Sequence, residues 1–117
     1  MKIKRIVPNI AAQDVVKAKQ FYGDLLGLGT VMDMGWIATF EADASMRPQL
    51  SVAAHGGSAT PVPDLTIEVD DLQEALRRFQ EAEIKIEYGP VTESWGVRRF
   101  YVRDPFGRLL NIMHHIQ

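Results

Sequence analysis

The residues of this chain that could do metal or acid–base chemistry are few and scattered. There are three histidines and no cysteine, so a zinc–thiolate site, a disulfide and a thiol nucleophile are excluded. His55 lies in a glycine-rich stretch, whereas His114 and His115 are adjacent near the C-terminus. Because neighbouring residues on a strand point to opposite faces, the adjacent pair is not expected to share an ion. We interpret all three as surface or linker histidines and expect no metal among them.

Two carboxylates, Asp64 and Glu68, share one face of a predicted strand. Burial would raise the pKa of either one and suit it to act as a general base. A position at the rim of a sheet would leave it an ordinary carboxylate, and the sequence allows both interpretations. No Ser-His-Asp arrangement or phosphate loop is visible, and the run Gly27-Leu28-Gly29 indicates a helix end. We therefore assign no catalytic residue and no cofactor from these patterns.

The two tryptophans both lie beside glycines in predicted turns. Trp36 follows Gly35 in a hairpin, and Trp95 precedes Gly96 ahead of the strand Val97–Arg103. Tryptophan is buried on average, so both could anchor the core. At the rim of a binding site they would instead form walls on which a flat or cationic molecule stacks. Both interpretations stay open.

Alternation along the strands separates residues that should meet a helix from residues that should face away from it. On Val97–Arg103, the apolar Phe100 and Val102 should pack against the helix, which leaves Arg99 and Tyr101 on the open face. Arg99 would there contact a ligand or pair with a carboxylate. The same reasoning places further residues on the open face: Val7, Asn9, Leu109, Asn111 and Met113. It places four others against the helices: Ile6, Ile10, Leu110 and Ile112.

The composition is that of one ordinary globular domain. The 117 residues carry a net charge of −2, so no strong positive field attracts nucleic acid or acidic lipid. Pro8, Asn9 and Gln13 interrupt any apolar leader segment, and no stretch approaches the roughly 18 apolar residues of a membrane span. We expect a single domain over residues 1–117 that is cytoplasmic and binds neither nucleic acid nor membranes.

The elements that would position these residues occur twice. Asp14 is suited to cap a helix that ends near Gly27, and Asp71 is suited to cap a second one. Strands are predicted in the first half at Ile3–Ala11, Thr30–Met34, Trp36–Glu41 and Gln49–Ala54. Strands are predicted in the second half at Leu65–Val69, Ile84–Tyr88, Val97–Arg103 and Arg108–His114.

A constant offset supports a tandem repeat. Asp14 and Asp71, Ala18 and Ala75, and Tyr22 and Phe79 are each 57 positions apart and match in type. Any two capped amphipathic helices align somewhere, but here the strand order matches too. We predict an α+β fold of two tandem β-α-β-β-β units, about 1–55 and about 64–117, joined by a linker of about 56–63. Pairing them would form a cup-shaped mixed β-sheet with helices on the outside, which is a natural small-molecule site.

Several short motifs resemble those of the vicinal-oxygen-chelate superfamily, which includes glyoxalases, bleomycin-resistance proteins and extradiol dioxygenases. In the first half, Asp14, Phe21-Tyr22 and Leu25–Leu28 resemble its opening pattern, and Pro8 resembles the version in bleomycin-resistance proteins. The second half carries three more such motifs: Glu68–Asp71, Trp95–Phe100 and Asp104–Arg108. No single motif is specific, but their order and spacing cover essentially the whole chain.

The resemblance implies four metal-ligand positions, which here hold Val7, Ser51, Asp64 and Asn111. Valine has no lone pair, and the neutral oxygens of serine and asparagine are weak ligands for divalent ions. One carboxylate does not replace the two histidines and two glutamates of the family. The resemblance therefore favours a metal-free branch of the superfamily and a homodimer whose binding grooves lie between two chains.

Three hypotheses follow. The first is a metal-free binding protein, most like the bleomycin-resistance group, for a small aromatic or amphipathic molecule. Its candidate ligand-binding residues are Val7, Asn9, Trp36, Ser51, Asp64, Trp95, Arg99, Tyr101 and Asn111. The second is an isomerase or lyase of the glyoxalase type that uses Asp64 or Glu68 as base and Arg99 as stabiliser. The third is a structural or regulatory dimer whose cup is filled by bulky side chains.

Overall fold

A computed structural model of the chain describes residues 1–116, which fall into two compact units. One unit is Val7–Val62, and the other joins Met1–Ile6 to the segment that begins at Pro63. Strand β1 (Ile3–Ala11) runs through both units, because the division falls between Ile6 and Val7. None of the described helices is long and apolar enough to cross a membrane.

The unit Val7–Val62 is a four-stranded mixed sheet with one helical segment. Its strands besides β1 are β2 (Gly29–Asp33), β3 (Ile37–Glu41) and β4 (Gln49–Ala53). They are hydrogen-bonded in the order β2-β3-β4-β1, with β1 and β4 parallel and the other pairs antiparallel. The predicted strands are confirmed here to within one residue.

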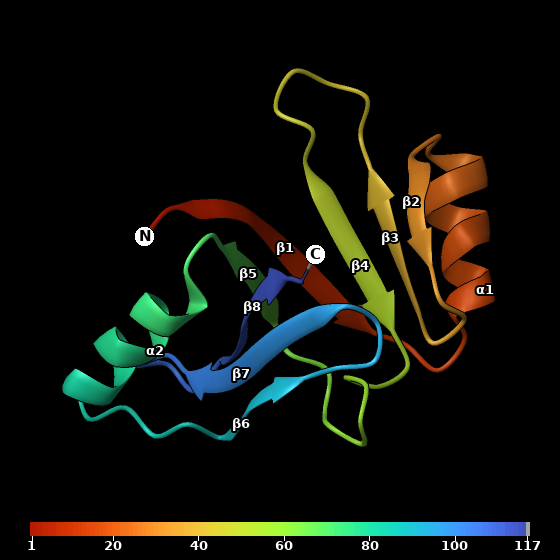
Figure 1. Cartoon of the computed structure of the whole chain (residues 1–117). Helices are drawn as coiled ribbons and strands as arrows, with labels where there is room; N and C mark the ends of the chain where they lie inside the picture. Colours follow the sequence, from red (N-terminus) through yellow and green to blue (C-terminus); the bar gives the residue numbers. More distant parts are fainter. Residues whose placement is uncertain (117) are drawn as a thin grey trace. The chain divides into compact units, whose positions relative to one another are not determined.

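The first helix begins as an α-helix and widens into a π-helix. Helix α1 (Val15–Ala18) is capped by Asp14, whose carboxylate accepts the N–H of Val16 at 3.0 Å, as predicted. It continues as η1 (Lys19–Leu25), closed by bonds such as Leu26 N–H to the Phe21 carbonyl. The helical segment lies beside β2 and β3 (Figure 1). The apolar spacing predicted a helix here but not its wider turns.

A cluster of apolar side chains joins this helix to its sheet. The cluster consists of Val15, Ala18, Ala38, Phe40 and Val52, with Ala12, Tyr22, Leu28 and Leu50 packed around it. Burial of such side chains is the main favourable term in folding. The helix and the central strands of this unit therefore form a core of their own.

The other unit repeats the plan. Its elements are β5 (Leu65–Val69), α2 (Leu72–Glu81), β6 (Tyr88–Thr92), β7 (Val97–Arg103) and β8 (Leu109–His115). Asp71 caps α2 by accepting the Glu74 N–H at 3.0 Å, as predicted. The strands follow the order β5-β8-β7-β6, with β5 and β8 parallel, and the start of β1 lies beside β5. This mixed α+β arrangement, built twice, confirms the predicted fold class.

The strand predicted at Ile84–Tyr88 is wrong, because β6 starts only at Tyr88. Ile84–Glu87 alternates like a strand but lies outside β6; the backbone N–H of Glu87 donates to the Tyr101 carbonyl of β7 at 2.8 Å. Gly89 and Pro90 look like strand breakers, yet they form a bulge inside β6 with a register shift between Tyr88 and Val91. Gly89 has φ +78° and lies so close to β7 that a Cβ would be 2.5 Å from the Arg99 carbonyl oxygen.

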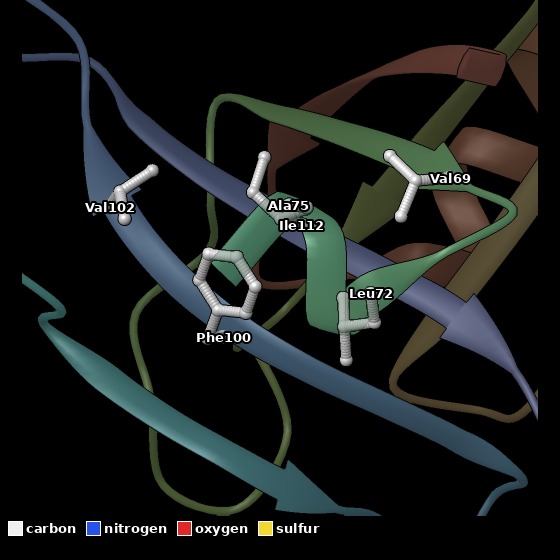
Figure 2. Packing of buried hydrophobic residues seen from close by; sticks show 6 residues of the cluster. All are labelled: Val69, Leu72, Ala75, Phe100, Val102 and Ile112. Atoms are coloured by element: carbon white, nitrogen blue, oxygen red, sulfur yellow. The ribbon is translucent and has the colours of Figure 1, made fainter. Parts of the chain in front are cut away.

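Figure 2 shows the core between α2 and its sheet. Phe100 and Val102 from β7 and Ile112 from β8 pack with Val69, Leu72 and Ala75, and Leu110 packs around this cluster. The predicted helix-side residues of β7 and β8 are thus confirmed. Two residues of β1 differ, because Ile6 and Ile10 are 57% and 41% exposed rather than packed beneath a helix.

Candidate functional site

We call Val7–Val62 the first unit, and Met1–Ile6 with the segment from Pro63 the second unit. The buried polar side chains of the second unit lie mostly on the side of its sheet opposite α2, here called the helix-free face. Alternation and register place on it, among others, seven residues that matter here: Thr66, Glu68, Arg99, Tyr101, Leu109, Asn111 and Met113. Six of the seven are buried, and Thr66 is half-buried. Arg99, Tyr101, Leu109, Asn111 and Met113 were predicted to face away from the helix, and all five do.

A buried ion pair lies at the β6–β7 end of this face. Arg99 is 3% exposed and donates to a single oxygen of Glu93, Oε2, from Nε at 2.7 Å and from Nη2 at 2.6 Å. The Tyr88 hydroxyl donates to the same oxygen at 2.9 Å, and Arg99 Nη1 donates to the Tyr101 hydroxyl at 2.8 Å. A buried charge needs such a partner, because its desolvation is costly.

Three aromatic rings surround the guanidinium of Arg99. Its central carbon lies 4.9 Å from the ring centroid of Tyr101, 5.0 Å from Trp95 and 5.4 Å from Tyr88. Such distances allow cation–π attraction. Trp95 is half-buried, so it is not a fully buried core anchor, and its role as a wall for a ligand stays a prediction. The cation beside these rings is therefore the guanidinium of Arg99, a group of the protein itself.

Asn111 occupies the middle of β8 and is 8% exposed. In the strand register it lies opposite Thr66 on β5 and opposite Tyr101 on β7. Its Nδ2 donates to the Thr66 hydroxyl at 3.3 Å. Among the described residues, no group hydrogen-bonds to its buried Oδ1. Buried polar atoms nearly always have a partner, so this oxygen requires an explanation.

The two candidate base carboxylates have different surroundings. Burial of Glu68 favours its neutral form, but hydrogen bonds from Arg5 and His115 outweigh burial and lower the pKa of Glu68. Lys4 Nζ lies 3.8 Å from the same carboxylate. Asp64 is exposed, and its Oδ2 accepts the backbone N–H of Leu109 at 2.9 Å. Proton abstraction at neutral pH favours an unpaired carboxyl of raised pKa, and the paired Glu68 with its lowered pKa differs from that.

Four of the predicted ligand-binding residues lie in the unit Val7–Val62. Asn9 and Ser51 are register partners on the parallel strands β1 and β4. The hydroxyls of Ser51 and Thr39 are 2.7 Å apart and buried, and Val7 is 2% exposed. Trp36 stacks on His55, with centroids 4.9 Å apart and planes 11° apart. Of the nine predicted ligand-binding residues, Val7, Asn9, Trp36 and Ser51 thus belong to this unit.

The donors at the four positions implied for metal ligands do not fit a divalent ion. In the first unit, Val7 offers an aliphatic side chain, and the Ser51 hydroxyl already bonds to Thr39. In the second unit, Asp64 bonds to backbone and Asn111 presents a neutral amide. Divalent metal ions favour imidazole and carboxylate ligands over aliphatic, hydroxyl and neutral amide side chains. Among residues 1–116, no group of three His, Asp or Glu side chains is arranged to hold an ion.

Glu93 and Tyr88 are the site residues that the sequence pattern missed. The reason is the misplaced strand, since β6 ending at Thr92 makes Glu93 the first residue of the turn into β7. Its N–H bonds to the Val97 carbonyl at 2.7 Å, which directs its side chain across the hairpin to Arg99. A hairpin centred on Trp95 would have indicated the pair, because cross-strand neighbours of opposite charge attract.

Comparison with known proteins was made for the whole chain. A family model described as the Glyoxalase/Bleomycin resistance protein/Dioxygenase superfamily matches residues 2–112. No curated protein sequence matches.

Among solved structures, similarity extends over nearly whole chains. A structure described as an NAD-dependent benzaldehyde dehydrogenase from Legionella pneumophila has 20% identity and a TM-score of 0.76, covering 95% of this chain and 99% of that one. A variant methylmalonyl-CoA epimerase of Streptomyces coelicolor has 16% identity and a TM-score of 0.72, covering 99% and 100%. A superfamily member from Vibrio splendidus has 19% identity and a TM-score of 0.65, covering 96% and 98%. At these identities the likeness establishes the fold alone.

Proposed function

Since the chain belongs to the glyoxalase/bleomycin resistance protein/dioxygenase superfamily, we propose that it is a metal-independent binding protein for a small aromatic or amphipathic molecule. One observation carries this proposal. The four positions implied for metal ligands hold an aliphatic side chain, a bonded hydroxyl, a carboxylate tied to backbone and a neutral amide. These four side chains can contact a ligand, but together they are not a set of ligands that a divalent metal ion favours.

The residues of the helix-free face favour a ligand that is mostly apolar and has few polar groups. Its buried members include Tyr101, Leu109 and Met113, and its buried charges, Arg99 and Glu93, neutralise each other. Pockets for small molecules are commonly apolar with a few placed polar atoms. Asn9, Trp36 and Ser51, in the unit Val7–Val62, stay proposed ligand contacts as well.

The alternative is an isomerase or lyase that uses Asp64 or Glu68 as a base. The methylmalonyl-CoA epimerases among the similar structures favour considering it. The lowered pKa of Glu68 and the backbone bond of Asp64 favour the binding protein. The enzyme would be established if the protein converts a bound compound, and if Asp64→Asn or Glu68→Gln abolishes that turnover while the affinity for the compound is unchanged.

A thermal-shift screen tests the proposed function. A ligand that binds only the native state stabilises it by about 2.7 kcal/mol at a hundred times its Kd. We expect at least one aromatic compound to raise the melting temperature, whereas Ni²⁺, Zn²⁺, Mn²⁺, Fe²⁺ and EDTA leave it unchanged. Stoichiometric metal in the purified protein, found by elemental analysis, would contradict the metal-independent part of the proposal.

A further inference from the structure

We propose that Oδ1 of Asn111 is the point at which the bound molecule is recognised, and that it accepts a hydrogen bond from a neutral N–H or O–H group of that molecule. The inference rests on the proposed function and adds the chemical class of the ligand. The ligand is an aromatic or apolar frame that carries a neutral donor, such as an indole or a phenol.

The unpartnered acceptor is the first step. Asn111 is more than nine-tenths buried, and its Nδ2 is engaged by Thr66 at 3.3 Å. Oδ1 lacks a partner among the described residues. A buried acceptor that has lost water without gaining a donor is destabilising, so such atoms are rare in folded proteins. A donor brought by a ligand would satisfy it.

The tandem repeat shows that this gap is not a general property of the fold. Asn9 and Ser51 pair on β1 and β4 as Thr66 and Asn111 pair on β5 and β8. In the first unit the hydroxyl of Ser51 is satisfied by Thr39 at 2.7 Å. On the second unit's β7 the residue opposite Asn111 is Tyr101, whose hydroxyl already accepts from Arg99. The orphaned oxygen is therefore specific to the second unit.

The surroundings specify a neutral donor on an apolar frame. Three apolar or aromatic residues flank Asn111 on its face: Leu109 and Met113 along β8, and Tyr101 across from it. A cationic ligand is disfavoured. Glu93 is neutralised by Arg99, and three basic side chains (Lys4, Arg5 and His115) already surround Glu68.

Matched probe pairs test the inference. Indole is compared with 1-methylindole and phenol with anisole, because each pair differs by one donor hydrogen. Binding to the full chain is followed by NMR, including the side-chain amide signal of Asn111. We expect the donor-bearing member to bind about tenfold more tightly, as loss of a buried hydrogen bond predicts, and to shift that signal.

Variants locate the effect. The double variant Asn111→Leu/Thr66→Val removes the amide and its hydroxyl partner together, so it leaves neither one unpaired. We expect it to unfold at a temperature no lower than the wild type, while the preference for the donor-bearing probe falls below about twofold. Thr92→Val, which removes an exposed hydroxyl from the same sheet, is the control and should retain the preference.

The outcomes separate this inference from the proposed function. If both members of each pair bind equally, the ligand-binding function stands and the inference is overturned; a buried water on Oδ1 would give this result. A donor preference that persists in the double variant also overturns it. If the double variant does not fold, an Asn111 signal that fails to shift with indole or phenol overturns it. If neither member of either pair binds, the inference is overturned together with the proposed aromatic ligand class, whereas amphipathic compounds in the thermal-shift screen still test binding itself.

Discussion

The Arg99–Glu93 pair places two charges where almost no solvent reaches them. Both side chains are about 5% exposed or less, and the glutamate oxygen also accepts from Tyr88. Removing one member of a buried pair typically costs about 3–5 kcal/mol, because the other is left uncompensated. We expect Glu93→Gln to lower the free energy of unfolding by that amount in urea denaturation.

Arg77→Ala is the control for this substitution. Arg77 pairs with Glu74 and Glu81 on the exposed side of α2, and exposed pairs contribute little. The urea midpoint of the control should stay close to that of the wild type. Equal effects of the two substitutions would show that the buried pair has no special weight.

Trp95 is expected to behave as a partly exposed wall rather than as a core anchor. It is half-buried and lies 5.0 Å from the Arg99 guanidinium. Trp95→Ala should therefore cost about 1–2 kcal/mol from the lost cation–π contact, less than the 3–5 kcal/mol of a buried aromatic. It should also weaken binding of any aromatic ligand. Collapse of stability with unchanged affinity per folded molecule would make Trp95 a core residue.

Glu68 should make stability depend on pH. Although burial opposes ionisation, hydrogen bonds from Arg5 and His115 hold its folded-state pKa below its ordinary value of 4.5. The unfolded state then binds more protons near that pH, so the contribution is complete above pH 4.5 and is lost as the pH falls through the folded-state pKa. Glu68→Gln should flatten the acid limb of the unfolding free energy plotted against pH. An unchanged acid limb would contradict this.

At the residue scale, sequence could assign faces but not partners. Alternation correctly separated Arg99 and Tyr101 from Phe100 and Val102, because a strand has a fixed period of two. It could not reveal that Arg99 pairs with Glu93, since that contact depends on where the hairpin turns. The roles of the nine candidate ligand-binding residues remain predictions.

At the element scale, Gly89 is the position in β6 where an added Cβ atom would collide with the neighbouring strand β7. A Cβ there would lie 2.5 Å from the Arg99 carbonyl oxygen, with φ at +78°. We expect Gly89→Ala to destabilise the protein by more than about 1 kcal/mol in urea unfolding.

Gly35→Ala is the matched control for Gly89. Gly35 has a similar φ of +83°, but a Cβ there would meet nothing within 4 Å. It should show only the backbone cost of a left-handed residue, about 1 kcal/mol. If the two variants lose equal stability, the close approach to β7 is unimportant.

Most elements were predictable because local signals agreed with the fold. The caps Asp14 and Asp71 and the period-two strands are such signals. Two features were not predictable. The strand β6 carries a glycine–proline bulge that resembles a turn, and the widened helix η1 has side-chain spacing that an α-helix also accepts.

For the whole molecule we propose a homodimer. Exposed aliphatic residues on β1, Ile6 at 57% and Ile10 at 41%, support a covering partner. Light scattering at micromolar concentration should give twice the chain mass of 13.2 kDa. Ile6→Lys/Ile10→Lys should shift it towards one chain mass, whereas Met46→Lys, at an exposed loop residue, should not. A wild-type mass of one chain would refute the dimer.

At this scale the sequence motifs predicted the superfamily because they recur in order along the chain, and the family match over residues 2–112 confirms it. The 57-residue offset predicted two similar halves, and each half folds into helix and strands in the same order. The identity of a ligand is a different kind of property. It depends on a few side-chain atoms, such as Oδ1 of Asn111, whose unpaired state no sequence pattern encodes.

The placement of the two tryptophans supplies a pair of optical reporters. Trp36 stacks on His55 in the unit Val7–Val62, and Trp95 lies beneath Arg99 in the other unit. A chain with Trp36→Phe emits only from the second unit, and a chain with Trp95→Phe only from the first. Fluorescence melts of the two variants would therefore show whether the units unfold in one step or in two.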